Sequence, residues 1–397
     1  MVTIDKIFHA SVVLKDIIRP TPLAKAYGIA EDCALYLKPE CLQKTGSFKL
    51  RGSGYKIAML SDEEKAKGVI ACSAGNHAQG VALAASKCGI SSLICLPDTA
   101  PISKVEATKG YGAQVCLVPG VYDDAYNKAL ELKEEHGYTF VHPFDDEYVI
   151  AGQGTIGLEI MNEMSDVDAV LVPIGGGGLI SGVACAIKSI SPHVKVYGGQ
   201  AAGAPSMYNA IHHGKMEALT SVSTIADGIA VKKPGELTYE MVKNYVDDIA
   251  LVTEDEIAAA ILALIEKQKM IAEGAGAVSV AAAMFHKFPL EGKKVVSLIS
   301  GGNIDVTSLS RVIDRGLMKS GRTTSLLIEL ADKPGQLMEV SRIIAQCGGN
   351  VISVHHERNG ETESINGCYL RLSLETRNYD HVQQITQALR DAGFKIV

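Results

Sequence analysis

Short runs of aliphatic and β-branched residues alternate with longer helical patterns through about the first 318 residues of the chain. The runs predict strands at Gly68–Cys72, Ser92–Leu96, Gln114–Val118, Ala169–Ile174, Lys195–Gly199 and Lys294–Ile299. Between them the patterns predict helices, for example over Ala78–Cys88, Tyr122–His136 and Asp255–Gln268. Apolar strands that alternate with helices are typical of a doubly wound α/β fold with parallel sheet.

Glycine-containing loops follow three of these predicted strands, at Ser73–Gly80, Gly175–Gly178 and Ser300–Asn303. Ligands of such folds bind beyond the carboxyl ends of the strands, so these loops are the candidate site. Gly175–Gly178 also precedes a predicted helix, and its backbone N–H groups could cradle a phosphate. The alternative is a plain tight turn between strand and helix, and this loop alone does not decide between the two.

The pattern changes after residue 318, where a short polar stretch over residues 319–324 reads as a linker. Residues 325–397 then predict strand, helix, two strands, helix and strand, with the second strand at Asn350–Glu357 and a turn at Asn359–Asn366 after it. This βαββαβ order is that of ferredoxin-like domains. The chain is therefore expected to hold a catalytic domain at 1–318 and a smaller domain at 325–397.

Composition excludes several partners. Lys and Arg total 38 against 45 Asp and Glu, a net charge of −7 without a long basic run, so no nucleic-acid partner is expected.

The nine cysteines form no C-x-x-C pair, so the sequence indicates neither a zinc cluster nor a redox pair. This cysteine usage favours a reducing, cytoplasmic setting. Residues 169–187 carry no charge, but Pro173 and the glycines interrupt them, so no membrane span is predicted.

Lys49 is the candidate nucleophile. It follows Ser47-Phe48 and stands at the start of a predicted helix over Leu50–Leu60. The positive potential of a helix N-terminus lowers the pKa of a lysine amine. A deprotonated lysine is the group that forms a Schiff base with an aldehyde cofactor.

Six stretches, in this order along the chain, resemble motifs of fold-type II pyridoxal-phosphate enzymes, in particular threonine dehydratases and serine racemases. They are Lys44-Thr-Gly-Ser-Phe-Lys49, Ser73-Ala-Gly-Asn-His-Ala-Gln-Gly80, Ala151-Gly-Gln-Gly-Thr-Ile-Gly157, Gly175-Gly-Gly-Gly-Leu179, Thr224-Ile-Ala-Asp-Gly228 and Ser300-Gly-Gly-Asn303. The resemblance implies a two-lobed catalytic domain that converts L-threonine to 2-oxobutanoate and ammonia, and L-serine to pyruvate.

The resemblance also implies a role for each matching residue. Lys49 would hold pyridoxal 5'-phosphate covalently and act as general base, Asn76 would bond the ring hydroxyl, and Ser300 would face the pyridine nitrogen. The phosphate would be bound by Gly175, Gly176, Gly177, Gly178 and Leu179. The substrate carboxylate would be bound by Ser73, Ala74, Gly75, Asn76 and His77. For His77, a structural hydrogen-bonding role is preferred to a catalytic one.

Two departures separate this chain from the racemases. In the loop that corresponds to Ser73–Gly80, which contains Asn76, racemases of the family have a second serine directly before the glycine. This chain has Ala74 at that position. A methyl group cannot transfer a proton, so dehydration is expected in preference to racemisation. The racemases also bind a divalent ion through carboxylates, but residues 198–213 contain no Asp or Glu, so no divalent metal site is expected. A monovalent ion on backbone carbonyls is left open by the sequence. The alternatives are a serine racemase, a β-replacing enzyme of the same fold and an inactive amino-acid sensor.

Residues 325–397 resemble an ACT domain. The signs are the βαββαβ order, Asp332-Lys-Pro-Gly-Gln-Leu337 at the first turn and Gly348-Gly-Asn-Val-Ile352 at the second strand. In that family, paired domains bind amino acids at their interface, which implies allosteric regulation by isoleucine or valine. It also implies at least a homodimer, and a homotetramer is expected. The alternative is an oligomerisation module without a ligand.

Overall fold

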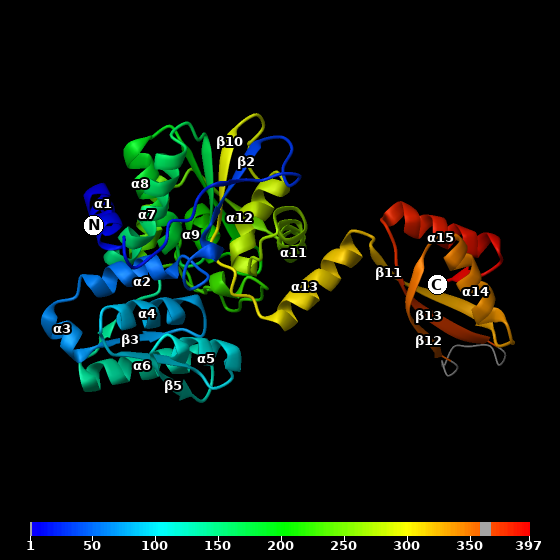
Figure 1. The fold of residues 1–397 in the computed structure, drawn as a ribbon, viewed down its shortest axis with the longest axis horizontal. Coiled ribbons are helices and arrows are strands. Elements are labelled where there is room, and N and C mark those ends of the chain that lie inside the picture. Colours follow the sequence, from blue (N-terminus) through cyan, green and yellow to red (C-terminus); the bar gives the residue numbers. More distant parts are fainter. Residues whose placement is uncertain (1, 358–366) are drawn as a thin grey trace. The chain divides into compact units, whose positions relative to one another are not determined.

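The computed structural model describes residues 2–357 and 367–397, and these divide into two compact units, 1–305 and 306–397. The first unit has two sheets, which Figure 1 shows as separate lobes. The predicted turn at Asn359–Asn366 lies outside the described residues. Within the described part of the chain, no helix combines the length and apolar character that crossing a bilayer requires.

The larger sheet has six strands in the order β1-β2-β10-β7-β8-β9. All neighbours run parallel except β1, which is antiparallel to β2. The strands are β1 Ala24–Lys25, β2 Ala34–Pro39, β7 Ala169–Pro173, β8 Lys195–Ala201, β9 Asp248–Val252 and β10 Lys294–Ile299. Figure 1 shows α7 and α8 on one side of this sheet and α12 on the other, which explains why strands such as β7 are buried along their whole length.

The smaller sheet has four parallel strands in the order β5-β4-β3-β6, between α4 and α6. Its strands are β3 Val69–Cys72, β4 Ser92–Pro97, β5 Gln114–Val118 and β6 Thr139–Phe140. The α-helices of the first unit are α1 Ile4–Val13, α2 Lys49–Ala58, α3 Asp62–Lys67, α4 Asn76–Lys87, α5 Ile102–Gly110, α6 Tyr122–His136, α7 Glu147–Glu163, α8 Gly178–Ile190, α9 Ser206–His213, α10 Glu236–Tyr245, α11 Glu254–Ala263 and α12 Gly274–Met284. Two short 3₁₀ turns are η1 Glu40–Leu42 and η2 Asp227–Ile229.

One predicted helix differs from the structure. The helix expected over Asp255–Gln268 is α-helical only through α11, and residues Leu264–Gln268 (η3) form a π-helical turn. Lys269 then adopts a left-handed conformation with φ 57°, which ends the helix. The π-turn widens the backbone where the helical pattern of the sequence continues unchanged.

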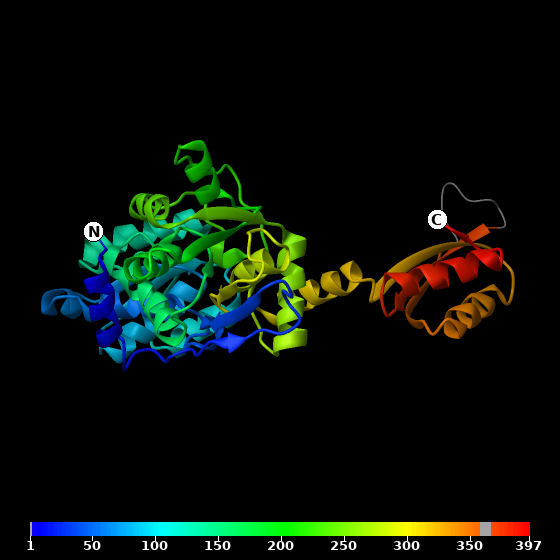
Figure 2. The same ribbon diagram turned by 90° about the horizontal axis from the view of Figure 1, so that it is seen from above.

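The second unit contains α13 Val306–Lys319, followed by the order βαββαβ. Its elements are β11 Thr323–Ala331, α14 Gln336–Gln346, β12 Asn350–Glu357, β13 Gly367–Glu375, α15 Tyr379–Asp391 and β14 Lys395–Ile396. The four strands form an antiparallel sheet in the order β12-β13-β11-β14, and Figures 1 and 2 place α14 and α15 on one face of it. The units divide before α13, whereas the sequence suggested a boundary at 318, because α13 contacts β11.

Candidate active site

A cavity of about 670 Å³ in the first unit is lined by every residue that the sequence analysis assigned to the site. They are Lys49, Ser73, Ala74, Gly75, Asn76, His77, Gly175, Gly176, Gly177, Gly178, Leu179 and Ser300. These residues come from segments far apart in the sequence. The structure therefore assembles one site, while the role of each residue stays a prediction.

Parallel strands bring the loops together. β7 and β10 are neighbours in the larger sheet, so the loops after Pro173 and Ile299 leave the same edge. β3 belongs to the smaller sheet and ends at Cys72, directly before Ser73. The cavity thus lies at carboxyl ends of strands from both sheets, as expected for ligand sites on parallel sheets.

Backbone hydrogen bonds place Lys49 beside Ser300. Ser47 forms an isolated antiparallel bridge with Gly301, and the N–H of Phe48 donates to the Ser300 carbonyl at 3.1 Å. Gly46 has φ +70°, and a Cβ atom there would lie 2.3 Å from Oδ1 of Asn303. Glycine is therefore required at this turn, which directs the chain into α2 at Lys49.

The Lys49 amine lies inside the cavity, where burial weakens its hold on a proton. Nζ donates to the carbonyl of Pro143 at 2.7 Å. Burial lowers the pKa of Lys49 to about 8, and the nearby Glu273 carboxylate opposes this shift. The main cause is thus desolvation, which depends on the tertiary structure, while the contribution of the helix terminus stays a prediction. A pKa of about 8 leaves a useful fraction of free amine near neutral pH.

Asn76 is held by Glu273 and Asn303, of which only Asn303 belongs to a loop that the sequence marks as part of the candidate site. Its Nδ2 donates to Oε1 of Glu273 at 2.6 Å, and its Oδ1 accepts from Nδ2 of Asn303 at 2.8 Å. Asn303 also donates to the Thr45 carbonyl at 2.7 Å. This arrangement fixes which end of the Asn76 amide faces each neighbour.

Glu273 is a buried carboxyl, 5% exposed, at the start of α12. Burial raises the pKa of Glu273 to about 7, and the charge of Asp227 raises it further, whereas the Asn76 hydrogen bond opposes the shift. The sequence around Glu273 gives no signal of its contact with the site, because its hydrogen-bond partner Asn76 is 197 residues away.

The loop Gly175–Gly178, called the glycine loop below, packs closely against neighbouring residues of the protein. A Cβ atom at Gly176 would lie 2.4 Å from the Phe144 ring, and one at Gly178 would lie 2.8 Å from the Phe144 carbonyl oxygen. The Gly176 carbonyl accepts from Oγ1 of Thr238 at 2.6 Å, which orients the loop. Gly177 has φ +96° and leads directly into the thirteen residues of α8. The first N–H groups of this helix have no partner within the helix, so they can bind an anion.

The loop Ser73–Gly75 leads into α4 at Asn76. Oγ of Ser73 accepts from the N–H of Gly75 at 3.1 Å, which closes a tight turn. A Cβ atom at Gly75 would meet nothing within 4 Å, so the space beside this backbone is open. The start of α4 and this open space together suit a small anion.

His77 is anchored in the protein. Its Nε2 lies 2.8 Å from the Val141 carbonyl oxygen and therefore donates to it. Burial lowers the pKa of His77 to about 3, and the charge of Lys49 contributes. The ring is thus neutral, with its lone pair on Nδ1. This geometry favours the structural role that the sequence analysis preferred.

Further residues complete the cavity wall. Phe48 and Asp227 lie within two of the six motifs, whereas no recognisable signal in the sequence marks Lys104, Tyr122, His142, Pro143 and Phe144. Nδ1 of His142 accepts from the N–H of Asp145 at 2.7 Å, and burial lowers the pKa of His142. Lys104 and Asp227 form an ion pair of 3.0 Å, which joins α5 to η2 across the cavity wall.

A buried ion network holds α2 against α7. Arg51 donates to both carboxylate oxygens of Glu40 at 2.8 Å and to those of Glu159 at 2.6 and 2.9 Å. Lys38 pairs with Glu159 at 2.7 Å. Arg51 and Glu40 have fully buried side chains. Because Arg51 lies on the same helix as Lys49, the network fixes the position of the candidate nucleophile.

The chain is similar to known pyridoxal-phosphate-dependent enzymes over most of its length. A family model described as pyridoxal-phosphate dependent enzyme matches residues 14–301. The L-threonine ammonia-lyase of Thermotoga maritima is 50% identical over 398 residues, covering 100% of this chain and 99% of that protein. The L-threonine ammonia-lyase of Geobacter sulfurreducens is 44% identical over 385 residues, covering 96% of each chain.

Solved structures show the same catalytic fold. Maize serine racemase superposes with a TM-score of 0.75 and 36% identity, covering 80% of this chain and 98% of that one. Threonine deaminase isoform 2 of Solanum lycopersicum superposes with a TM-score of 0.74 and 39% identity, covering 78% of this chain and 93% of that one.

Proposed function

Since the chain belongs to the family of pyridoxal-phosphate-dependent enzymes, we propose that it dehydrates and deaminates L-threonine, giving 2-oxobutanoate and ammonia. L-Serine would give pyruvate in the same way. The observation that carries the proposal is the cavity in which the Lys49 amine, the glycine loop and Ser300 meet. Two relatives that match nearly the whole chain are threonine ammonia-lyases, which supports threonine as substrate.

The residues of the cavity fit the cofactor. The glycine loop and the start of α8 offer N–H groups for the phosphate, with Leu179 at the edge of the same loop. The Lys49 amine suits the aldehyde, the Asn76 amide suits the ring hydroxyl, and Ser300 suits the pyridine nitrogen. When bound, the cofactor withdraws electrons from the substrate α-carbon.

Lys49 is the proposed general base. With its pKa lowered to about 8, Nζ can hold or release a proton near neutral pH. Its hydrogen bond to the Pro143 carbonyl keeps the amine in the cavity. Proton transfer at the substrate α-carbon is therefore assigned to this atom.

The substrate carboxylate is assigned to Ser73, Ala74, Gly75, Asn76 and His77. The open space beside Gly75 and the start of α4 support this assignment. His77 would contribute through its backbone, because its Nε2 is engaged with Val141.

Ala74 favours the lyase over a serine racemase. Ala74 lines the cavity, and its methyl group cannot deliver a proton to the face of the substrate opposite Lys49. Racemisation needs a proton donor on each face, whereas dehydration needs one base. The likeness to maize serine racemase keeps racemisation as the second candidate.

For residues 325–397 we propose an ACT domain that senses isoleucine or valine. The observed βαββαβ order and the helices on one face of the sheet support it. A cavity of about 270 Å³ beside the turn Asp332–Gly335 is the proposed effector site. β12 is an edge strand with Ile352 and Val354 exposed, which suits pairing with a second copy in a dimer or tetramer.

The test is formation of 2-oxo acid from L-threonine and L-serine by the purified holoenzyme, with and without isoleucine. We expect product from threonine, and its loss in Lys49→Ala with loss of the visible absorbance of the bound cofactor. Absence of 2-oxo acid together with appearance of D-serine from L-serine would instead support the racemase. A change of rate with isoleucine would support the regulatory role.

A further inference from the structure

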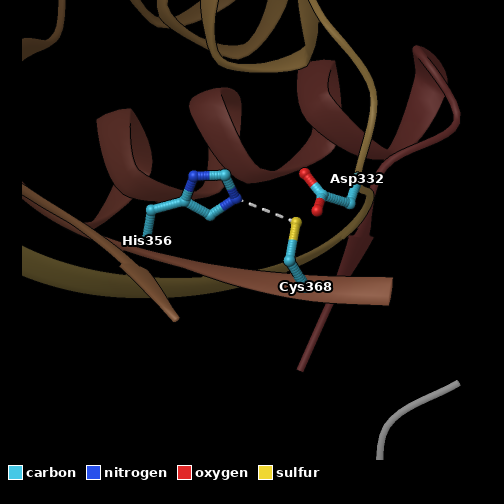
Figure 3. A group of neighbouring side chains, drawn as sticks. All are labelled: Asp332, His356 and Cys368. Carbon is cyan, nitrogen blue, oxygen red and sulfur yellow. Dashed lines mark hydrogen bonds between the residues drawn. The ribbon is translucent and has the colours of Figure 1, made fainter. Parts of the chain in front are cut away.

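Three side chains that the catalytic function does not use meet in the second unit. Asp332 follows β11, His356 lies on β12 and Cys368 lies on β13. Their ligand atoms, one from each residue, all lie within 4.8 Å of one another. Figure 3 shows the imidazole of His356 and the carboxylate of Asp332 directed at the sulfur of Cys368 from different sides.

Strand register brings these residues to one face of the sheet. His356 pairs with Leu370, so it lies diagonally beside Cys368 on the same face. Leu330 pairs with Cys368 and stands two positions before Asp332. Leu330, Cys368 and Leu370 are buried on this face, whereas Asp332 and His356 are exposed where the face opens. The cluster is thus a partly enclosed set of donors at the end of an apolar core.

The donor set is that of a transition metal. Nε2 of His356 lies 3.0 Å from Sγ of Cys368. A tetrahedral zinc ion with these ligands needs donor separations of about 3.4–3.6 Å, so the imidazole must move slightly away from the sulfur. The Asp332 carboxylate lies within 4.8 Å of the other two ligand atoms, and rotation of its exposed side chain can adjust this separation. Thiolate, imidazole and carboxylate together favour Zn²⁺ or Co²⁺ over Mg²⁺ and Ca²⁺, which prefer oxygen ligands.

We infer that Asp332, His356 and Cys368 form a binding site for a zinc-class divalent ion in the second unit. Three protein ligands leave the fourth coordination position open. All three residues line the cavity of about 270 Å³, so this position is open to a small molecule. Cys368 is 1% exposed, which suits a bound ion better than a thiol that attacks a large substrate.

This site differs from the prediction of neither a zinc cluster nor a divalent ion, which rests on cysteine spacing and on residues 198–213. The ligands come from three separate strands or strand ends, so no short spacing pattern marks them. Binding of the ion does not depend on the proposed amino-acid effector, because the ion needs only the three side chains.

The test uses the full-length holoenzyme, dialysed free of metal and then equilibrated with zinc chloride without added amino acids. Metal analysis should find about one more ion per chain in the wild type than in His356→Ala. His355→Ala is the matched control, because this exposed neighbour pairs with Arg371 and faces the other side of the sheet. The affinity should fall more than about 100-fold in His356→Ala and stay unchanged in His355→Ala.

X-ray absorption at the zinc edge supplies a second readout. One sulfur ligand at about 2.3 Å is expected in the wild type and is expected to be absent in Cys368→Ser. Equal zinc content in the wild type and His356→Ala, or no sulfur ligand in the wild type, would overturn the inference. Binding should strengthen with rising pH, since the ion needs the thiolate.

Discussion

At the residue scale, burial sets the protonation of the candidate site. The Lys49 amine and the Glu273 carboxyl share one cavity, and desolvation shifts both toward their neutral forms. His77 is shifted the same way and stays neutral. Opposed shifts of an acid and a base in one cavity are a frequent mark of a catalytic site.

Glu273 should make the stability of the cofactor-free protein depend on pH. Its pKa is about 7 in the folded chain and near the ordinary 4.5 when unfolded. Between these values the folded chain holds a proton on Glu273 that the unfolded chain releases, so the contribution of Glu273 to the free energy of unfolding falls as pH rises. Buried His77 contributes the opposite trend below its ordinary pKa of 6.5. Glu273→Gln should remove this contribution, so the difference in the free energy of unfolding between wild type and variant should change by up to about 3 kcal/mol from about pH 5 to about pH 8. Urea unfolding at each pH measures this difference.

The exposed Glu106 offers a control for that experiment, and Glu106→Gln should leave the pH dependence as in the wild type. An unchanged slope in Glu273→Gln would show that Glu273 ionises normally in the folded chain.

At the element scale, two sets of contacts position the phosphate end and the lysine end of the proposed cofactor site. Phe144 and Thr238 pack on the glycine loop before α8, and the Arg51 network holds α2 against α7. The loop would bind the phosphate end and α2 carries the lysine. Rigid support at both ends fixes the distance between them.

Gly176→Ala should weaken cofactor binding. The added methyl would lie 2.4 Å from the Phe144 ring, so either the ring or the loop must move. Overpacking of this kind costs about 1–3 kcal/mol, which corresponds to roughly 5- to 150-fold weaker binding if the strain falls on the bound state. Titration of the cofactor-free protein with pyridoxal phosphate measures the dissociation constant of the cofactor. Gly110→Ala serves as control, because a Cβ atom there meets nothing within 4 Å. Equal cofactor affinities of Gly176→Ala and Gly110→Ala would show that the loop accepts a methyl group without loss of binding.

Arg51→Met should destabilise the first unit. It leaves the fully buried carboxylate of Glu40 without its ion partner, whereas Glu159 keeps Lys38. Loss of one partner of a buried ion pair costs about 3–5 kcal/mol. Urea unfolding measures the loss, and the double variant Glu40→Met/Arg51→Met should recover part of it. If the double variant is less stable than Arg51→Met, the buried charge is not the cause.

At the scale of the whole molecule, each unit has its own apolar core. One cluster of buried side chains, which includes Ile328, Leu370 and Ile385, belongs entirely to the second unit. The clusters around Leu50 and Val172 belong to the first. Separate cores predict that the units fold independently.

A chain that ends at Lys319 should therefore keep the catalytic reaction and lose the response to isoleucine. All residues assigned to the active site lie before this point. We expect 2-oxobutanoate formation from threonine to within a few-fold of the full chain, and no change on addition of isoleucine. An assay for 2-oxo acid measures the rate and its response to isoleucine. Size-exclusion chromatography shows whether the truncated chain is folded and soluble. A truncated chain that still responds to isoleucine would place the effector site in the first unit.

The sequence by itself determined the local features of this protein. Apolar runs and glycine loops are encoded by neighbouring residues, so β5, β10, α6 and β12 have the predicted bounds, and Lys49, Asn76, the glycines and Ser300 were identifiable from their motifs. The tertiary structure alone decided the contacts over long separations. Glu273 and Asn303 contact Asn76, burial lowers the pKa of Lys49, and Asp332, His356 and Cys368 meet. These contacts form because strand order and register join segments that no sequence spacing relates.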